Sequence, residues 1–509
     1  MSAESKVSKN YPTKLILARN TIFNFIGQAI PLIAGIITLP FIIKGLGTQR
    51  FGLLSLALVI LGYFAVFDLG LGRATTKLVA ESVGKGEKEK ISIIVWTSVT
   101  IQFIFGMIGT FIFLAIVPVL ATKLLNIPPE LQTEAKSTFY MLAFTLPILL
   151  ISSSFRGVLE AFQRFDLVNI ITIPSNSMTF ILPLIGIHLG LSLPWIVGLI
   201  LVTRVMTLLT YLFFCIHLVP SLKQYSYSIE LFKHLFSFGF WIMISNIVGP
   251  ILVYLDRFLI GVFSSLSQVA YYTAPYEAIT RIWIIPFSLV STLFPTFSSL
   301  SAIKDIEKIK SLFFRSIKYL LIILGPIIIF IIVFAQELLM VWLGKDFAEN
   351  SKEVVRILAF GVLINSLAHI PYALLQSSGR PNLTAKFHII ELPIYFFLAL
   401  ILVSKWGING AATVWTLRVI LDTALLYGAT FKIYKFSFNL FSSYKITKTL
   451  YTLLIFGSLL YTIKILSFLL HFIILLVSFI ICLLIFLWFI WSKVLDKSEK
   501  EIILGGLRL

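Results

Sequence analysis

Apolar runs of about twenty residues recur along almost the whole of this 509-residue chain, and they constrain its fold more than any other feature. The hydrocarbon core of a bilayer is about 30 Å thick, and a helix of about 20 apolar residues crosses it. The chain is 58% hydrophobic and only 13% charged, a balance far from that of soluble globular proteins. The pattern therefore predicts an all-α polytopic membrane protein.

Fourteen runs are long enough to cross a bilayer. They lie at 20–43, 51–71, 91–120, 138–155, 170–189, 195–219, 238–263, 270–300, 316–334, 354–375, 385–403, 407–430, 449–468 and 472–491. The polar segments between them predict four parts. These are an N-terminal lobe of six helices (1–220), a cytoplasmic linker (221–237), a C-terminal lobe of six helices (238–434), and two accessory helices with a cytoplasmic tail (435–509).

The distribution of Lys and Arg predicts the topology, because cytoplasmic loops of membrane proteins collect positive charge. With the N-terminus inside, the alternate loops and the two ends, together with the lysines within about a turn of a span end, carry 28 basic residues on the inner side and 8 on the outer side. The net charge of +18 is therefore interpreted as a topology signal, not as a nucleic-acid surface, which twenty-residue apolar runs would interrupt. Both termini are expected in the cytoplasm.

The two six-helix blocks resemble each other. The segment LEAFQRFDL from Leu159 matches LQSSGRPNL from Leu375, and Thr203-Arg204-Val205 matches Leu417-Arg418-Val419 at almost the same offset. Because each unit has an even number of helices, such repeats run parallel and are related by a pseudo-two-fold axis along the membrane normal. This arrangement predicts two lobes, with the last two helices outside the repeat.

Charged side chains inside predicted spans need a reason, since each costs at least about 2.5 to 3.5 kcal/mol at the bilayer centre. Five arginines lie there. Arg356 is within about one turn of a helix end, so it is interpreted as an interfacial residue. For Arg257 and Arg281 a functional role is favoured, whereas for Arg204 and Arg418 a functional and a purely structural role both remain open.

Three carboxylates accompany these arginines. Glu277 with Arg281, and Arg418 with Asp422, are each four residues apart, which puts each pair on one face of a helix where it can neutralise itself. Asp256 and Arg257 are adjacent and point roughly 100° apart, so partners on other helices are expected.

The remaining polar candidates are Asp68 and three amides. Asp68 and Arg73 bracket two glycines at the inner end of the second span, where a polar helix end is the simplest interpretation. Asn24, Gln28 and Asn246 lie at intermediate depths, where amides either bridge helices or line a wet cavity.

Catalytic and metal-binding motifs are missing from the sequence. It contains no phosphate-binding loop of the ATPase type, its six histidines have no paired metal spacing, and its two cysteines each sit inside an apolar run. No cofactor, no metal site and no enzymatic activity are therefore expected.

Two segments carry a resemblance to a known family. FDLGLGRATTKLVAE at the end of the second span and YLDRFLIG in the seventh resemble the polysaccharide transporter family, the flippases of undecaprenyl-linked oligosaccharides. This family belongs to the multidrug/oligosaccharidyl-lipid/polysaccharide exporter superfamily. The resemblance implies two rocking lobes around a central cavity lined chiefly by spans one, two, seven and eight.

The resemblance also implies a function. The expected activity is transfer of undecaprenyl-(pyro)phosphate-linked oligosaccharide from the inner to the outer leaflet of the bacterial cytoplasmic membrane by alternating access. Arg257, Arg281, Arg204 and Arg418, with the three amides, would bind the substrate, because guanidinium groups bind phosphate bidentately.

Partners and rival functions follow from the same reasoning. Glu277, Asp256, Asp422 and Asp68 would couple transport to H⁺ or Na⁺, and membrane lipids and the polysaccharide polymerase machinery are the other expected partners. A multidrug antiporter of the same superfamily is the main alternative, although arginines favour an anion over a cationic drug. A polymerase or glycosyltransferase is disfavoured by the short predicted outer loops.

The topology can be tested with single cysteines introduced at Lys88 and Lys308 in a cysteine-free background. Both loops are expected in the cytoplasm, so an impermeant thiol reagent should label them only after the membrane is permeabilised. Lys123→Cys, in a predicted outer loop, is the control that should react in intact cells. Labelling of the first two positions in intact cells would contradict the topology.

Overall fold

The computed structural model describes residues 14–68, 71–231, 252–466, 472–496 and 499–501, which are helical apart from short connections. Nine helices in this described part are long and apolar enough to cross a membrane. Where the structure describes them, the fourteen predicted spans fall on helical segments, and the seventh is described only over 252–263. The prediction of an all-α polytopic membrane protein is confirmed.

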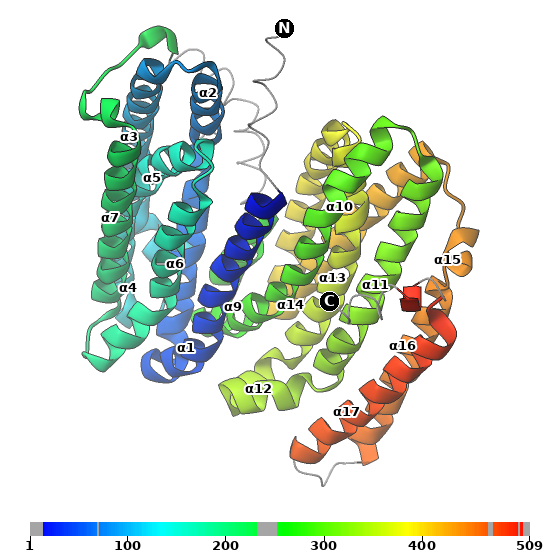
Figure 1. Cartoon of the computed structure of the whole chain (residues 1–509). Helices are drawn as coiled ribbons and strands as arrows, with labels where there is room; N and C mark the ends of the chain where they lie inside the picture. Colours follow the sequence, from blue (N-terminus) through cyan, green and yellow to red (C-terminus); the bar gives the residue numbers. More distant parts are fainter. Residues whose placement is uncertain (1–13, 69–70, 232–251, 467–471, 497–498, 502–509) are drawn as a thin grey trace, which may run out of the picture. The chain divides into compact units, whose positions relative to one another are not determined.

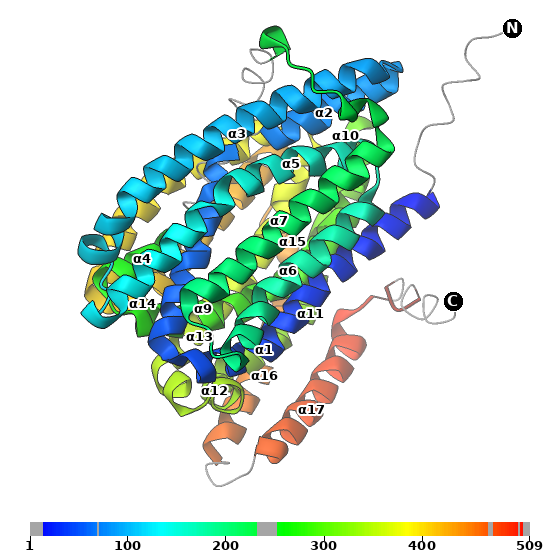
Figure 2. The ribbon, with the colours of Figure 1, turned by 90° about the vertical axis from the view of Figure 1, so that its left-hand side faces the viewer.

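The chain forms two compact units, 1–270 and 271–509. The first contains α1 (Lys14–Tyr63), the short helix η2 (Phe64–Asp68), α2 (Leu71–Lys85), α3 (Lys88–Val119), η3 (Leu120–Leu124), α4 (Pro129–Ala143), α5 (Thr145–Ala161), α6 (Phe165–His188), α7 (Leu193–Leu218), η4 (Pro220–Lys223) and the helix at 252–263. Helices α3, α5, α7 and α6 lie side by side in Figure 2. Their buried side chains, such as Phe155 and Cys215, form one apolar core.

The second unit begins within α9 (Leu266–Thr280). It continues with η5 (Arg281–Trp283), α10 (Ile284–Ala302), α11 (Ile306–Val333), α12 (Ala335–Leu343), α13 (Lys345–Ser377), α14 (Pro381–Tyr434), α15 (Asn439–Ser443), α16 (Ile446–Leu466), α17 (Phe472–Phe489) and η6 (Ile490–Val494). Helix α16 packs against α11 and α17 against α16 (Figure 1).

The order of neighbours in the first unit recurs in the second. Helices α2, α3 and α5 contact one another, and so do α10, α11 and α13, which follow in the same order along the chain. The shorter helix α4 precedes α5 and contacts it. In the same way, the short helix α12 precedes α13 and contacts it. This recurrence agrees with the repeat seen in the sequence.

Two predicted connections are tighter than expected. The predicted loops at 44–50 and 404–406 each reduce to a single non-helical glycine, Gly47 (φ 75°) inside α1 and Gly407 (φ 54°) inside α14. Side chains other than hydrogen disfavour these backbone angles, so glycine allows the turn without a longer loop. A Cβ on Gly410 would lie 1.9 Å from the Leu402 carbonyl oxygen, so the two halves of α14 meet closely at this turn.

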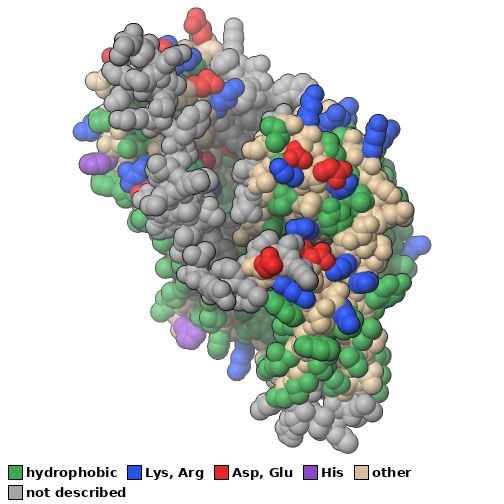
Figure 3. Space-filling view, turned by 45° about the vertical axis from the view of Figure 1, so that its right-hand side comes forward, with side chains coloured by type: hydrophobic (Ala, Val, Ile, Leu, Met, Phe, Trp, Pro, Cys, Tyr) green, Lys and Arg blue, Asp and Glu red, His purple; other side chains and the backbone are tan. Residues whose placement is uncertain are grey.

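Large apolar side chains are exposed on the accessory helices, among them Tyr451 and Leu454 on α16 and Leu484 and Trp488 on α17. Exposed rows of this kind are suited to contact with lipid. On the face drawn in Figure 3, hydrophobic side chains cover the lower part of the second unit, and charged side chains lie at its upper end and across its middle.

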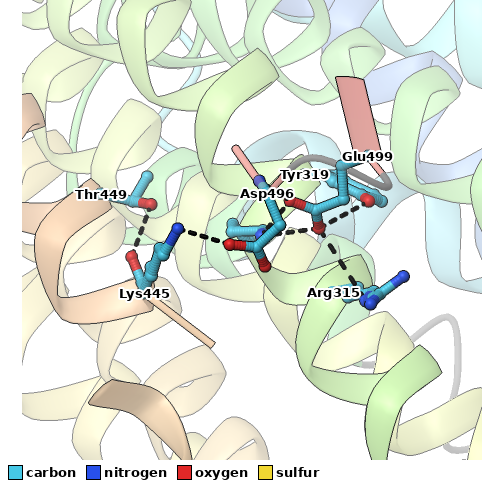
Figure 4. Close-up of polar contacts among 7 residues, drawn as sticks. Arg315, Tyr319, Lys445, Thr449, Asp496 and Glu499 are labelled. Atoms are coloured by element: carbon cyan, nitrogen blue, oxygen red, sulfur yellow. Dashed lines mark hydrogen bonds and ion pairs between the residues drawn. The ribbon is translucent and has the colours of Figure 1, made fainter. Parts of the chain in front are cut away.

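A polar cluster ties the segment after α17 to the rest of the second unit (Figure 4). Glu499 is fully buried and accepts hydrogen bonds from the Lys318 ammonium at 2.8 Å and the Tyr319 hydroxyl at 2.9 Å. Lys445 at the start of α16 donates to Asp496, whose own backbone N–H donates to Glu499 at 2.9 Å. The two carboxylates therefore hold the chain end against α11 and α16.

Electrostatics keep these two carboxylates ionised. The hydrogen bond from Lys445 lowers the pKa of Asp496. Burial acts to raise the pKa of Glu499, but hydrogen bonds from the Asp496 N–H, Lys318 and Tyr319 outweigh it, and the pKa lies below its usual value. Such a group stabilises the fold above its unfolded pKa of about 4.3 and loses that contribution as the pH falls through the lowered folded pKa.

Glu499→Gln should therefore destabilise the purified protein, because it leaves Lys318 buried without a counter-charge. Removing one member of a buried pair costs about 3 kcal/mol, so the unfolding temperature in detergent at neutral pH should fall clearly. Glu501→Gln, at an exposed position two residues on, is the matched control and should leave the temperature unchanged. Equal unfolding temperatures for the two variants would show that the cluster does not hold the chain end.

Candidate functional site

Asp68 lies in a buried network of hydrogen bonds within the first unit, at the end of η2. The Gln102 amide on α3 and the Ser153 hydroxyl on α5 both donate to Asp68 Oδ1, at 3.0 and 2.7 Å. Ser154 donates to the Gln102 amide oxygen at 2.7 Å and lies 2.8 Å from the Ser98 hydroxyl. Asp68 is thus part of a network joining α3 and α5, not only a polar helix end. The side chain of Arg73 lies outside the described residues.

Asp256 and Arg257 are buried on the helix at 252–263, with 0% and 2% of their surface exposed. Asp256 accepts the Arg257 backbone N–H at 2.7 Å, and the Arg257 guanidinium lies 5.5 Å from the centre of the Tyr254 ring. Tyr63 at the end of α1 packs edge-on against Tyr254 at 5.8 Å. Both charges therefore lie beside the aromatic contact that joins this helix to α1.

Arg204 is held by hydroxyl groups. Its guanidinium donates from α7 to Ser175 at 3.0 Å and to Thr179 at 3.2 Å, both on α6. The Arg204 Nε atom is buried and has no hydrogen-bond partner among the described residues. A cation whose described partners are neutral is suited to meet an anion.

Glu277 and Arg281 form the ion pair that their spacing predicted, with 3.1 Å between Oε2 and Nη2. Helix α9 ends after Thr280, and Arg281 begins the short helix η5 that also carries Trp283. The Arg281 side chain is 41% exposed and that of Glu277 is 33% exposed. Such an exposed pair contributes little to stability, so the guanidinium remains accessible to another anion.

Aromatic rings lie next to Arg281 in sequence. Trp283 packs edge-on against Phe287 at 6.5 Å, and half of the Phe287 surface is exposed. The Trp283 indole nitrogen has no hydrogen-bond partner among the described residues. The same short segment therefore carries an accessible cation and an exposed aromatic ring.

The structure places a different carboxylate than expected against Arg418. Its guanidinium lies 3.9 Å from Glu391, which is fully buried on the preceding half of α14, whereas the Asp422 Oδ1 atom has no hydrogen-bond partner among the described residues. Nitrogen or oxygen atoms of His388, Glu391 and Asp422 lie within 4.8 Å of one another. Arg418 adds a fixed positive charge that opposes a metal ion there.

Three amides predicted to bind substrate cannot be placed. Asn24 and Gln28 lie on α1, but their side chains are outside the described residues, as is the whole of Asn246. Their roles remain predictions.

Glu391, Gln102 and the Lys318–Glu499 pair were not predicted from the sequence. Glu391 stands in the apolar run 385–403 and could have been found as a charged residue within a predicted span. Lys318 also lies within a predicted span, but its partner is 181 residues away. Gln102 could not be recognised from the sequence, because isolated amide side chains are common in membrane helices.

Two family models match the chain. The model described as polysaccharide biosynthesis protein matches residues 17–301, and the MatE model matches residues 242–401. A putative O-antigen transporter of Shigella flexneri is 30% identical over 410 residues, which cover 81% of this chain and 96% of that protein. A probable low-salt glycan biosynthesis flippase of Haloferax volcanii is 25% identical over 440 residues, covering 83% and 86%.

Solved structures show the same fold. Lipid II flippase MurJ in an inward closed conformation superposes with a TM-score of 0.72 at 14% identity, over 93% of this chain and 99% of that one. An inward-facing multidrug resistance MATE transporter gives 0.69 at 17% identity, over 80% and 94%. The chain therefore belongs to the polysaccharide biosynthesis protein family, and its resemblance to the polysaccharide transporters of the multidrug/oligosaccharidyl-lipid/polysaccharide exporter superfamily is confirmed.

Proposed function

We propose that this chain flips undecaprenyl-(pyro)phosphate-linked oligosaccharide from the inner to the outer leaflet of a bacterial cytoplasmic membrane by alternating access. The observation that carries the proposal is the accessible Arg281 guanidinium, on the same segment of the chain as Trp283 and Phe287. The names of the Shigella and Haloferax relatives support the same class of cargo and a transporter without enzymatic activity.

The cargo sets the chemical requirement. A phosphate or pyrophosphate and a string of sugars would lose their hydrogen bonds to water in hydrocarbon, at a cost of several kcal/mol for each unpaired polar group. A guanidinium replaces water at two phosphate oxygens at once, which an ammonium cannot do with the same geometry. Arg281 is accessible enough for this exchange because its pair with Glu277 is half exposed.

Aromatic residues suit the sugar portion. Ligand sites commonly combine aromatic walls with a few polar groups that fix orientation. Trp283 and Phe287 supply rings, and the Phe287 ring is half exposed. Arg257, Arg204 and Arg418, with Asn24, Gln28 and Asn246, remain the other candidates for substrate contacts.

Energy for net transport would come from H⁺ or Na⁺ moving down its gradient. Glu277, Asp256, Asp422 and Asp68 are the carboxylates proposed to couple the two movements, since an intramembrane carboxylate changes its charge when it binds an ion. We also propose that both chain ends face the cytoplasm and that polysaccharide polymerase machinery receives the flipped product.

Replacing Arg281 should impair transport through loss of its charge. In proteoliposomes that contain undecaprenyl-pyrophosphate-linked oligosaccharide, Arg281→Ala should slow flipping by about tenfold, the equivalent of one charged hydrogen bond of about 1.5 kcal/mol. Arg281→Lys should recover part of the rate because it keeps the charge but loses the bidentate fork. Arg257→Gln is expected to impair flipping as well.

The matched control is Arg356→Ala. Arg356 is also a half-exposed arginine of the second unit in an ion pair, 2.6 Å from Glu353, but was assigned to the membrane interface. Its variant should flip at the parental rate. If Arg281→Ala and Arg257→Gln, inserted at parental levels, do the same, the arginine mechanism is wrong.

A further inference from the structure

The two halves of α14 bring together a buried charged cluster, His388, Glu391, Arg418 and Asp422. Glu391 has no exposed surface, and neither of its carboxylate oxygens has a hydrogen-bond partner among the described residues. The His388 Nδ1 and Arg418 Nη1 atoms lie 3.7 and 3.9 Å from Glu391 Oε2, beyond hydrogen-bond distance. The carboxylate is thus buried but incompletely satisfied.

The charges of this cluster do not balance. Two carboxylates and one guanidinium leave a net charge of −1 when His388 is neutral. The charged groups that act on His388 and Asp422 are the other members of the cluster. Helix α13 packs against α14, but its described part adds no charged group to the cluster. An unbalanced charge in a low-dielectric interior is costly, and two neighbouring carboxylates commonly share one proton. One bound proton makes the cluster neutral.

The internal repeat shows that the fold does not require these carboxylates. At the offset that aligns Leu159 with Leu375, Thr172 and Ser175 on α6 correspond to His388 and Glu391 on α14, and Arg204 corresponds to Arg418 at nearly the same offset. In the first unit, Ser175 and Leu208 occupy the positions of Glu391 and Asp422, and Arg204 donates hydrogen bonds to the Ser175 and Thr179 hydroxyls instead of facing a carboxylate. The arginine is common to both units, but the two carboxylates occur only in the second.

We propose that Glu391 and Asp422, with His388 and Arg418, form a reversible one-proton site that couples transport to H⁺. This inference rests on the proposed transport function and adds Glu391 and His388 to the coupling groups. A proton suits the site better than a metal cation, because Arg418 repels a cation and hard cations take six or more oxygen ligands. The His388 side chain is 38% exposed and so connects the buried carboxylates with the surface.

The two protonation states imply two pairings of Arg418. When Glu391 is ionised, the guanidinium pairs with it across the turn at Gly407, as the structure shows. When His388 passes a proton to Glu391, the carboxylate becomes a neutral acid, and the guanidinium pairs with Asp422, four residues along the same helix. Release of the proton to water reverses the exchange. The bond between the halves of α14 therefore depends on the proton.

The test uses Glu391→Gln and Asp422→Asn, which keep the side-chain shape but cannot ionise. Glu353→Gln, an exposed carboxylate of α13, is the matched control. The first readout is independent of transport: infrared difference spectra of the purified protein at two pH values should contain a protonated carboxylic acid band that both cluster variants lose and the control keeps. Each variant removes a different carboxylate. If one of the two variants folds poorly, the spectrum of the other still tests the proton site.

The second readout is flipping in proteoliposomes under an imposed pH gradient. The pH gradient should raise the flipping rate of the parent and of Glu353→Gln several-fold, and it should leave the rate of the two cluster variants unchanged. Retention of the band and of the acceleration by both variants would overturn the site, as would a parent driven by a Na⁺ gradient but not by a pH gradient. If the parent flips no lipid-linked oligosaccharide but the band behaves as expected, the proposed cargo fails while the proton site stands.

Discussion

Every charged or polar group that enters the hydrocarbon must find a partner inside the protein, and this constraint organises the structure. The described part of the chain meets it in four ways. Gln102 and Ser153 surround Asp68 with donors, hydroxyl groups on α6 hold Arg204, and a carboxylate on the other half of α14 faces Arg418. Lys318 and Glu499 show the fourth case, a buried pair that fastens the chain end.

The proposed function uses exceptions to this rule. Arg281 is paired but half exposed, and Glu391 is buried but lacks close hydrogen bonds. The first arrangement leaves a cation able to exchange its carboxylate for a phosphate, and the second leaves a carboxylate able to take up a proton. A transporter needs groups of both kinds, because it must bind and release its cargo and its coupling ion in turn.

The fold was largely predictable because membrane-spanning helices are recognised in a sequence by their length and apolar composition. The turns at Gly47 and Gly407 were predicted as longer loops. A single glycine with positive φ makes each turn, and hydropathy does not distinguish such a turn from a loop. The Glu277–Arg281 pair was predictable because both residues lie on one helical face. Glu391 and Arg418 were not matched, because 27 positions of sequence separate them and only the close return of α14 brings them together.

The central claim is that a cationic group recognises the phosphate of a lipid-linked oligosaccharide. The most direct measurement compares flipping by the purified parent of two lipids that carry the same oligosaccharide, one on undecaprenyl pyrophosphate and one on an uncharged polyprenyl ether. Impermeant enzymes that cut the exposed sugar report the rate in proteoliposomes. The account predicts fast flipping of the pyrophosphate lipid and slow flipping of the neutral one, whereas equal rates for both would contradict it.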